Sequence, residues 1–188
     1  MESKEITIDC NGLPMRFAVE EYDDHVVLVR YLSKQVSELV IPDEINGKPV
    51  TEIDKICFCK HPEINEIVFS DNLVKIGDQA FALCSGITKL HLPDSITEIG
   101  YFAFRDCTGL REIIMPANLK RLQTGTFSFC YLPDTVKIVL KEGLEVIEPK
   151  IFSSGGLPHF FTLEIPSTVK TIAKDAFDYG IKLIFKED

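Results

Sequence analysis

Six cysteines and four histidines are the side chains of this 188-residue chain that could bind a metal or act as nucleophiles. Three of the cysteines recur at a step of 23 residues in the pattern Phe-x-x-Cys, as Phe81/Cys84, Phe104/Cys107 and Phe127/Cys130. A free cysteine packs as a small hydrophobic residue. Because these thiols occupy one position of a regular step, we interpret them as reduced structural residues of a core.

Two other groups of residues have the chemistry of metal ligands. Cys57, Cys59 and His61 could bind zinc, but their C-x-C spacing is tighter than the C-x2-C of zinc knuckles. The acidic run Glu20–Asp24 could bind Ca²⁺ through oxygens, but it lacks the D-x-D-x-D-G spacing and is more typical of a solvated turn. A disulfide framework is a further alternative for six cysteines. We predict no metal and no cofactor.

Catalytic motifs are not present in the chain. No H-E-x-x-H, G-x-S-x-G, G-K-[ST] or G-x-G-x-x-G occurs. The run Ser153-Ser154-Gly155-Gly156 has no strand–loop–helix context that would predict a phosphate cradle. An enzyme with a site in the Ser153–Phe161 loop, around His159, is one hypothesis that stays open, but we predict that the chain is not an enzyme.

A repeated unit must position these residues, because self-similarity at a period of 20–50 residues indicates a stacked array. The units are Val50–Asn72, Leu73–Ser95, Ile96–Asn118, Leu119–Gly143, Leu144–Thr168 and the truncated Val169–Asp188. The first three are 23 residues long and the next two are 25. The extra residues fall around Tyr131–Thr135 and Ser153–His159, and we interpret both insertions as surface loops.

Each unit reads as one coil of a solenoid. Position 1 and position 4 are aliphatic throughout, and position 9 is always phenylalanine: Phe58, Phe81, Phe104, Phe127, Phe152 and Phe177. Positions 18 and 20 are apolar at the i, i+2 spacing of a strand with one buried face, in every unit down to Leu183/Phe185. Proline at position 21 of three units ends that strand. We predict a short strand, a turn or short helical segment with the phenylalanine, and a second strand, stacked in parallel ladders.

Charged residues at two further positions support this register. Position 17 reads Glu66, Lys89, Glu112, Lys137, Thr162, Lys182, and position 3 reads Glu52, Lys75, Glu98, Arg121, Val146, Thr171. Equivalent positions are neighbours in a parallel stack, so this alternation places opposite charges side by side. We interpret both columns as structural.

One outward position breaks the polar pattern. Position 19 reads Val40, Val68, His91, Ile114, Val139, Glu164 and Ile184, and we call this column the position-19 stripe. β-Branched residues suit strands in any case, and a sheet covered on its second face would also explain them. Exposed contiguous apolar area, however, usually marks an interface. Our hypothesis for a partner-binding surface is therefore Val68, His91, Ile114, Val139, Glu164 and Ile184.

The N-terminal residues 1–35 do not match the repeat. Ile6–Ile8, Met15–Tyr22 and His25–Leu32 alternate like strands, and Asp23-Asp24 reads as a turn. We predict a β-hairpin cap over the first coil, followed by an array over residues 36–188, in one structural domain. The strand ending Leu39–Pro42 resembles those of the repeats, so we expect stacking to begin before Val50.

Composition restricts the classes of partner. With 45% hydrophobic residues the chain is globular, and its formal charge of −9 argues against binding nucleic acid or an anionic membrane. No apolar run approaches the ~20 residues of a membrane helix. The first residues show no basic region followed by an apolar stretch. We therefore expect either a cytoplasmic protein or one whose export signal has been removed.

The unit Leu-x-x-Ile-(Gly)-x-x-Ala-Phe-x-x-Cys-x-x-Leu-x-x-Ile-x-Leu-Pro resembles the BspA-like leucine-rich repeat, with its best copies at Leu73–Pro93 and Ile96–Pro116. The resemblance covers about residues 36–188. It implies a right-handed solenoid of ~23-residue coils and a bacterial protein, often at the cell surface, without enzyme activity. The implied function is non-enzymatic protein–protein interaction or adhesion, with an unidentified protein, such as a host or cell-surface protein, or less often a glycan as partner. The alternative is a structural spacer or self-associating segment of a larger surface protein.

Overall fold

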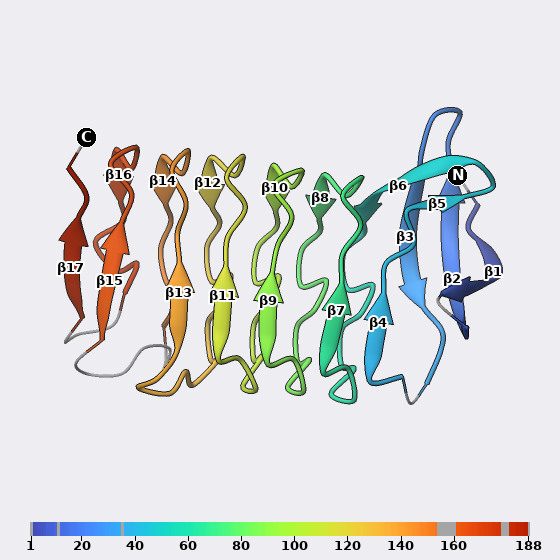
Figure 1. The fold of residues 1–188 in the computed structure, drawn as a ribbon, viewed down its shortest axis with the longest axis horizontal. Coiled ribbons are helices and arrows are strands. Elements are labelled where there is room, and N and C mark those ends of the chain that lie inside the picture. Colours follow the sequence, from blue (N-terminus) through green and yellow to red (C-terminus); the bar gives the residue numbers. More distant parts are fainter. Residues whose placement is uncertain (1, 11, 35, 154–160, 178–180, 188) are drawn as a thin grey trace.

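The second strands of successive coils lie side by side along one face of an elongated stack. The computed structural model describes residues 2–10, 12–34, 36–153, 161–177 and 181–187, with the N- and C-terminal ends at opposite ends of the stack (Figure 1). The strands of this face are β4 (Glu38–Val40), β7 (Glu66–Val68), β9 (Lys89–His91), β11 (Glu112–Ile114), β13 (Lys137–Val139), β15 (Thr162–Ile165) and β17 (Lys182–Phe185). Among the described residues, no helix is long and apolar enough to cross a membrane.

The first strands of the coils form a second row, which is divided into two hydrogen-bonded sheets between Ile99 and Arg121. They are β6 (Lys48–Ile53), β8 (Lys75–Ile76), β10 (Glu98–Ile99), β12 (Arg121–Leu122), β14 (Val146–Ile147) and β16 (Thr171–Ile172). All coil-to-coil pairs on both faces are parallel and join equivalent positions of the repeat, such as Glu112 with Lys89 and Lys137. The predicted solenoid and its register are therefore confirmed, and β4 confirms that stacking begins before Val50.

A hydrogen-bonded turn joins the two strands of each coil, where the sequence predicted either a turn or a short helical segment. Amides of one turn donate to carbonyls of the next coil, as Phe58 N does to Ala80 O at 2.8 Å and Phe81 N to Ala103 O at 2.8 Å. The turn needs a left-handed residue at position 7. Gly125 adopts this conformation without steric cost. Ile56 and Phe102 occupy the same position of their coils with φ of 61° and 56°.

The phenylalanines at position 9 form a continuous ring stack through the core. Successive ring centroids lie 4.9, 5.4, 5.6, 5.4 and 6.2 Å apart, with interplanar angles between 5° and 15°. From Phe58 to Phe152 these side chains are 0% exposed, and only Phe177 is partly buried. At the N-terminal end Tyr31 and Phe17 close the stack, with centroids 5.3 and 6.4 Å from Phe58. Aromatic contacts therefore run from the cap to the last coil.

The cysteines at position 12 form a hydrogen-bonded ladder beside this stack. The Sγ of Cys84 donates to the carbonyl of Phe58 at 3.0 Å, and Cys107 and Cys130 donate to Phe81 and Phe104 at 3.2 Å. Burial raises the pKa of the Cys84 and Cys130 thiols to about 12. These cysteines are thiols in the protein core, as predicted.

Glycine at position 5 lets neighbouring coils approach closely. A Cβ on Gly77 would lie 2.6 Å from the backbone nitrogen of Lys55 in the preceding coil, and a Cβ on Gly100 would lie 2.6 Å from that of Asp78. No side chain fits at such distances unless the backbone moves. The repeated Ile-Gly pair therefore reflects contact between turns.

The N-terminal cap contains two hairpins rather than one. β1 (Lys4–Cys10), β2 (Leu13–Glu21) and β3 (Val26–Tyr31) pair antiparallel in sequence, and β3 then pairs in parallel with β6. All three strands were predicted, but the continuation of the cap into the sheet of the first coils was not. A further hairpin joins β5 (Glu44–Ile45) to β6.

The last coil departs from the predicted burial. Phe185, at position 20, was predicted to be buried but is 60% exposed, and Leu183 at position 18 is only partly buried. Position 20 is buried at Leu92, Met115, Leu140 and Ile165, and Phe69 in the first coil is partly buried. Among the described residues nothing packs beyond β17, so its apolar side chains remain at the surface.

Candidate interaction surface

The position-19 stripe lies in register on the outer face of the second strands. Val40 pairs with Val68, Ile114 lies between His91 and Val139, and Glu164 pairs with Ile184. Val68 and Ile184 are each 43% exposed, and Val40, Ile114 and Val139 are partly exposed. Because none of these residues is buried, no described element covers this face. Neighbouring parallel strands lie ~4.8 Å apart, so residues of the stripe adjoin within each of the three sheets β4-β7, β9-β11-β13 and β15-β17.

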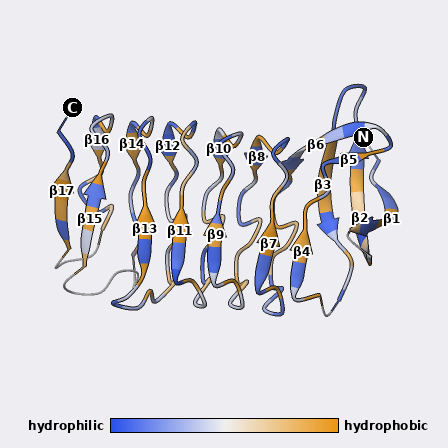
Figure 2. Cartoon of the chain, viewed as in Figure 1, coloured by the Kyte–Doolittle hydropathy of each residue, from blue (hydrophilic) through white to orange (hydrophobic). Residues whose placement is uncertain are grey.

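Charged residues border the stripe at position 17. In Figure 2, β7, β11 and β13 pass from a hydrophilic start to a hydrophobic end. The Glu112 carboxylate accepts hydrogen bonds from Lys137 at 2.6 Å and lies 3.2 Å from the His91 ring. The hydrogen bond from Lys137 lowers the pKa of Glu112 most, and the hydrogen bond from His91 lowers it further. Of the predicted alternation of charge at position 17, the described residues form one ion pair, between Glu112 and Lys137, beside the stripe.

The charge column at position 3 lies on the other ladder. Lys75 forms an ion pair with Glu52 at 2.9 Å and is also paired in register with Glu98. Arg121 departs from the column and pairs with Glu148 instead. These exposed pairs support the register of the coils and contribute ~0.2–1 kcal/mol each.

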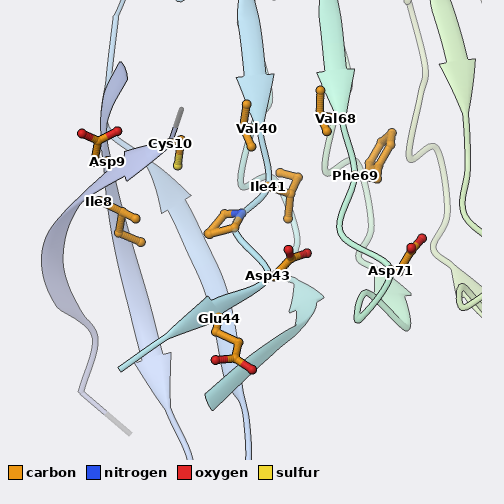
Figure 3. Close-up of a pocket in the computed structure, with 11 residues that line it drawn as sticks. Ile8, Asp9, Cys10, Val40, Ile41, Asp43, Glu44, Val68, Phe69 and Asp71 are labelled. Carbon is orange, nitrogen blue, oxygen red and sulfur yellow. The ribbon is translucent and has the colours of Figure 1, made fainter. Parts of the chain in front are cut away.

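A groove lies where the stripe meets the cap. Its volume is about 520 Å³, and it opens between β1 on one side and β4 and β7 on the other (Figure 3). Ile8, Val40, Val68 and Phe69 are among its apolar lining residues, and Asp9, Asp43, Glu44 and Asp71 line it with carboxylates. Val40 and Val68 belong to both the groove and the stripe.

Sequence reasoning did not find this groove, because it forms where the non-repeating cap meets the first coils. One sequence signal pointed to part of it. Asn46-Gly47, with φ 55° and 75°, forms the tight turn between β5 and β6, and Asn-Gly is the strongest short hairpin signal. That hairpin fixes the position of Glu44 at the rim of the groove.

The residues with potential metal or catalytic chemistry are dispersed. Cys57 is buried, Cys59 is partly exposed, and His61 instead forms a 2.8 Å contact with Glu63. In the described ranges, no three His, Cys, Asp or Glu side chains gather in metal-binding geometry. His159 and most of the Ser153–Phe161 loop lie outside the described residues.

The acidic run Glu20–Asp24, at the end of β2 and in the turn before β3, forms local contacts. Glu20 accepts a hydrogen bond from the Tyr22 hydroxyl at 2.9 Å, and Asp24 contacts the His25 ring at 2.7 Å. Glu21 bonds Lys4, Asn46 and Lys48, and the hydrogen bond from Lys4 contributes most to lowering its pKa to about 2. Glu21 therefore ties β2 to β1 and to the β5–β6 hairpin.

Comparison with known protein families identifies the repeat. A family model described as the BspA type leucine rich repeat region matches residues 51–184 in six copies. A comparison with curated proteins finds no match. The six matched copies cover the array that the periodicity predicts.

Solved structures share the fold. A leucine rich cell surface protein from Faecalibacterium prausnitzii aligns over 95% of this chain and 54% of its own, with 19% identity and a TM-score of 0.61. A leucine-rich repeat protein from Eubacterium ventriosum aligns over 97% of this chain and 51% of its own, with 20% identity and a TM-score of 0.69. One from Bacteroides capillosus aligns over 72% and 98%, with 24% identity and a TM-score of 0.58. The chain thus spans about half the length of the first two, and the likeness concerns the fold.

Proposed function

Because the chain belongs to the BspA-type leucine-rich repeat family, we propose that it is a non-enzymatic module for protein–protein interaction and adhesion. Its contact surface is the position-19 stripe. The residues that we assign to partner binding are Val68, His91, Ile114, Val139, Glu164 and Ile184.

The exposed register of the stripe carries this proposal. Aliphatic side chains adjoin in register at Val40 and Val68 and again at Ile114 and Val139, with His91 between the two pairs and without a described cover. Surface apolar residues that are contiguous, rather than scattered, mark interaction sites. The ion pair of Glu112 with Lys137 runs along the border of the strip, which matches the apolar core and polar rim of protein interfaces.

The environment of the thiols supports a role other than nucleophilic catalysis. A reactive cysteine needs a lowered pKa and solvent access. Cys107 is fully buried, and burial raises its pKa well above the ordinary range of a thiol. The phenylalanines and cysteines that recur most regularly in the repeat therefore form the core. We assign recognition to residues at the surface.

The proposal includes display at a bacterial cell surface. The Faecalibacterium prausnitzii protein that shares the fold is described as a cell surface protein. The formal charge of −9 favours contact with protein partners over anionic lipid or nucleic acid. We therefore place the adhesive role at the cell surface, with a protein of the host or of another cell as partner.

Replacing Ile114 and Val139 by lysine tests the stripe. The double variant places two charges at the centre of the apolar strip, so we expect it to lose most of the partner retained by the wild-type chain in a pull-down. A matched control replaces Val74 and Tyr101, which are 41% and 50% exposed away from the stripe, by lysine. Unchanged retention by the stripe variant, with native circular dichroism, would remove the proposal.

Self-association is a second candidate, favoured by the last strand. Ile184 and Phe185 on β17 are 43% and 60% exposed, and β17 has only β15 as a described neighbour. An open apolar strand edge is a template for pairing with another chain. Sedimentation velocity of the wild type and of Phe185→Lys distinguishes this candidate, because a monomer in both cases excludes it.

A further inference from the structure

We propose that the groove between β1 and β4 binds an extended segment of a partner protein in which Lys or Arg alternates with apolar residues, and that this segment adds as a strand to the free edge of β4. This inference deepens the proposed role in protein binding and depends on it. The groove lies at the cap end of the stack, where it shares Val40 and Val68 with the stripe but does not include Ile114 or Val139 (Figure 3).

The free edge of β4 faces the cap. β4 pairs only with β7 among the described strands. Ile41 N donates to Val68 O at 2.9 Å, and Ser37 O accepts from Asn65 N at 2.8 Å, so these backbone groups point toward β7. Successive residues of a strand direct their backbone groups to opposite edges. The N–H and C=O of Val40 therefore point toward the groove, where an added strand would pair with them.

The size and lining of the groove suit a short extended peptide. Its volume of about 520 Å³ lies within the ~300–1,000 Å³ typical of ligand pockets. Ile8 from β1 and Val40 from β4 flank it, and Phe69 adds an aromatic side chain (Figure 3). An edge strand gives affinity through its backbone, and pockets for alternate side chains give specificity. The apolar residues of the segment would pack here.

Charge decides which segment fits. Asp43, Glu44 and Asp71 are exposed at the rim, and in the described part of the chain none of them forms an ion pair with Lys or Arg. The carboxylate of Asp9 accepts a hydrogen bond from Gly12 N at 2.6 Å, but it has no ion-pair partner there either. By contrast, Glu112 on the stripe is paired. A rim of unneutralised carboxylates around an apolar floor attracts cationic residues.

A labelled peptide, acetyl-Lys-Val-Lys-Val-Lys-amide, tests the proposal directly. Titration into the ¹⁵N-labelled 188-residue chain, followed by amide chemical shifts, should perturb Val40 and Val68 first. The matched peptide with Glu in place of Lys should bind at least 10-fold more weakly, because it meets carboxylates of like charge. A peptide N-methylated at its central residue loses a backbone donor and should also bind more weakly.

Two variants connect the binding to the groove. Asp43→Asn with Asp71→Asn should weaken binding of the Lys peptide about 5-fold, the combined effect of two exposed ion pairs. Asp23→Asn with Asp134→Asn makes the same change of net charge at exposed sites elsewhere and should leave binding unchanged.

Three results would overturn the proposal: equal weakening by both pairs of variants, shifts confined to residues outside the groove, or no binding at millimolar peptide. The Ile114→Lys/Val139→Lys variant separates this proposal from the proposed function. It should retain peptide binding while losing the natural partner. If the partner is lost but the wild type binds no peptide, the groove proposal fails and the stripe proposal stands.

Discussion

Removing one ring from the middle of the phenylalanine stack should cost far more stability than removing the last ring. Phe104 is 0% exposed and stacks on Phe81 and Phe127, with centroids 5.4 and 5.6 Å away. Phe177 is partly buried and has one neighbour in the stack, Phe152, at 6.2 Å. Replacing each phenylalanine by alanine therefore compares a buried ring that has two stacked neighbours with a partly buried ring that has one.

The magnitudes follow from burial and from the number of stacked partners. Truncation of a buried Phe to Ala typically costs ~3–5 kcal/mol, and each stacked aromatic pair adds ~0.5–1.5 kcal/mol beyond the buried area. Phe104→Ala loses two such pairs, so we expect a cost near 5 kcal/mol. Phe177→Ala loses one pair and less buried area, so we expect about 2 kcal/mol.

Urea unfolding followed by circular dichroism measures both free energies of unfolding. Phe104→Leu is the milder companion, because it retains part of the apolar volume while losing the stacking, with an expected cost of ~1–3 kcal/mol. Equal losses for Phe104→Ala and Phe177→Ala would refute the reasoning, since the interior ring would then contribute no more than the terminal one.

Three other predictions concern the cap, the turns and the cysteine ladder. Hydrogen bonds, chiefly from Lys4, hold the pKa of Glu21 at about 2 in the fold against 4.5 ordinarily. The folded protein should therefore lose stability as the pH falls from 4.5 toward 2. Glu21→Gln should make the urea midpoint depend less on pH across that range. Ile56 is 54% exposed at φ 61°, and Ile56→Asn should raise the free energy of unfolding by ~0.5–1 kcal/mol, because Asn tolerates the left-handed conformation. Burial raises the pKa of Cys59 and, much more, that of Cys107, but only Cys59 is partly exposed. A thiol reagent at pH 8 should therefore modify Cys59 slowly in the native protein and Cys107 only in urea, as read by peptide mass spectrometry.

Each of these outcomes has a matched control. Glu2→Gln should leave the acid slope as in the wild type, because Glu2 lies outside the pairs that Glu21 forms. Ile56→Val keeps the β-branched side chain and should bring no gain, so an equal gain from both variants would contradict the backbone explanation. Modification of Cys107 at the rate of Cys59 in the native protein would show that the ladder opens far more readily than its burial implies.

The repeating part of the fold could be predicted because each position recurs in the same environment. Phe58 through Phe177, the strands ending in proline, and the alternating Glu112 and Lys137 all follow from the period. The direction of position 19 could likewise be predicted, because it lies between two buried positions of one strand, but a second layer over that face could not be excluded from the sequence. Every one of these inferences rests on contact between identical positions of neighbouring coils.

The parts that escaped prediction depend on contacts that do not repeat. The pairing of β3 with β6 joins the cap to the first coil once, and the groove beside Val40 forms from that single junction. The left-handed backbone of Ile56 and Phe102 had no sequence signal, because neighbouring coils impose it through their hydrogen bonds, and only Gly125 marks the position. The exposure of Phe185 depends on what lies beyond the last strand, which an internal period does not specify.

Quantitative mass spectrometry of proteins retained by the immobilised chain tests most directly whether the position-19 stripe binds a partner. The comparison uses three forms: the wild type, Ile114→Lys/Val139→Lys on the stripe, and Val74→Lys/Tyr101→Lys away from it. We predict that at least one protein is retained by the wild type and by the Val74/Tyr101 variant, and is lost from the Ile114/Val139 variant. Retention of the same proteins at the same levels by all three forms would contradict the account.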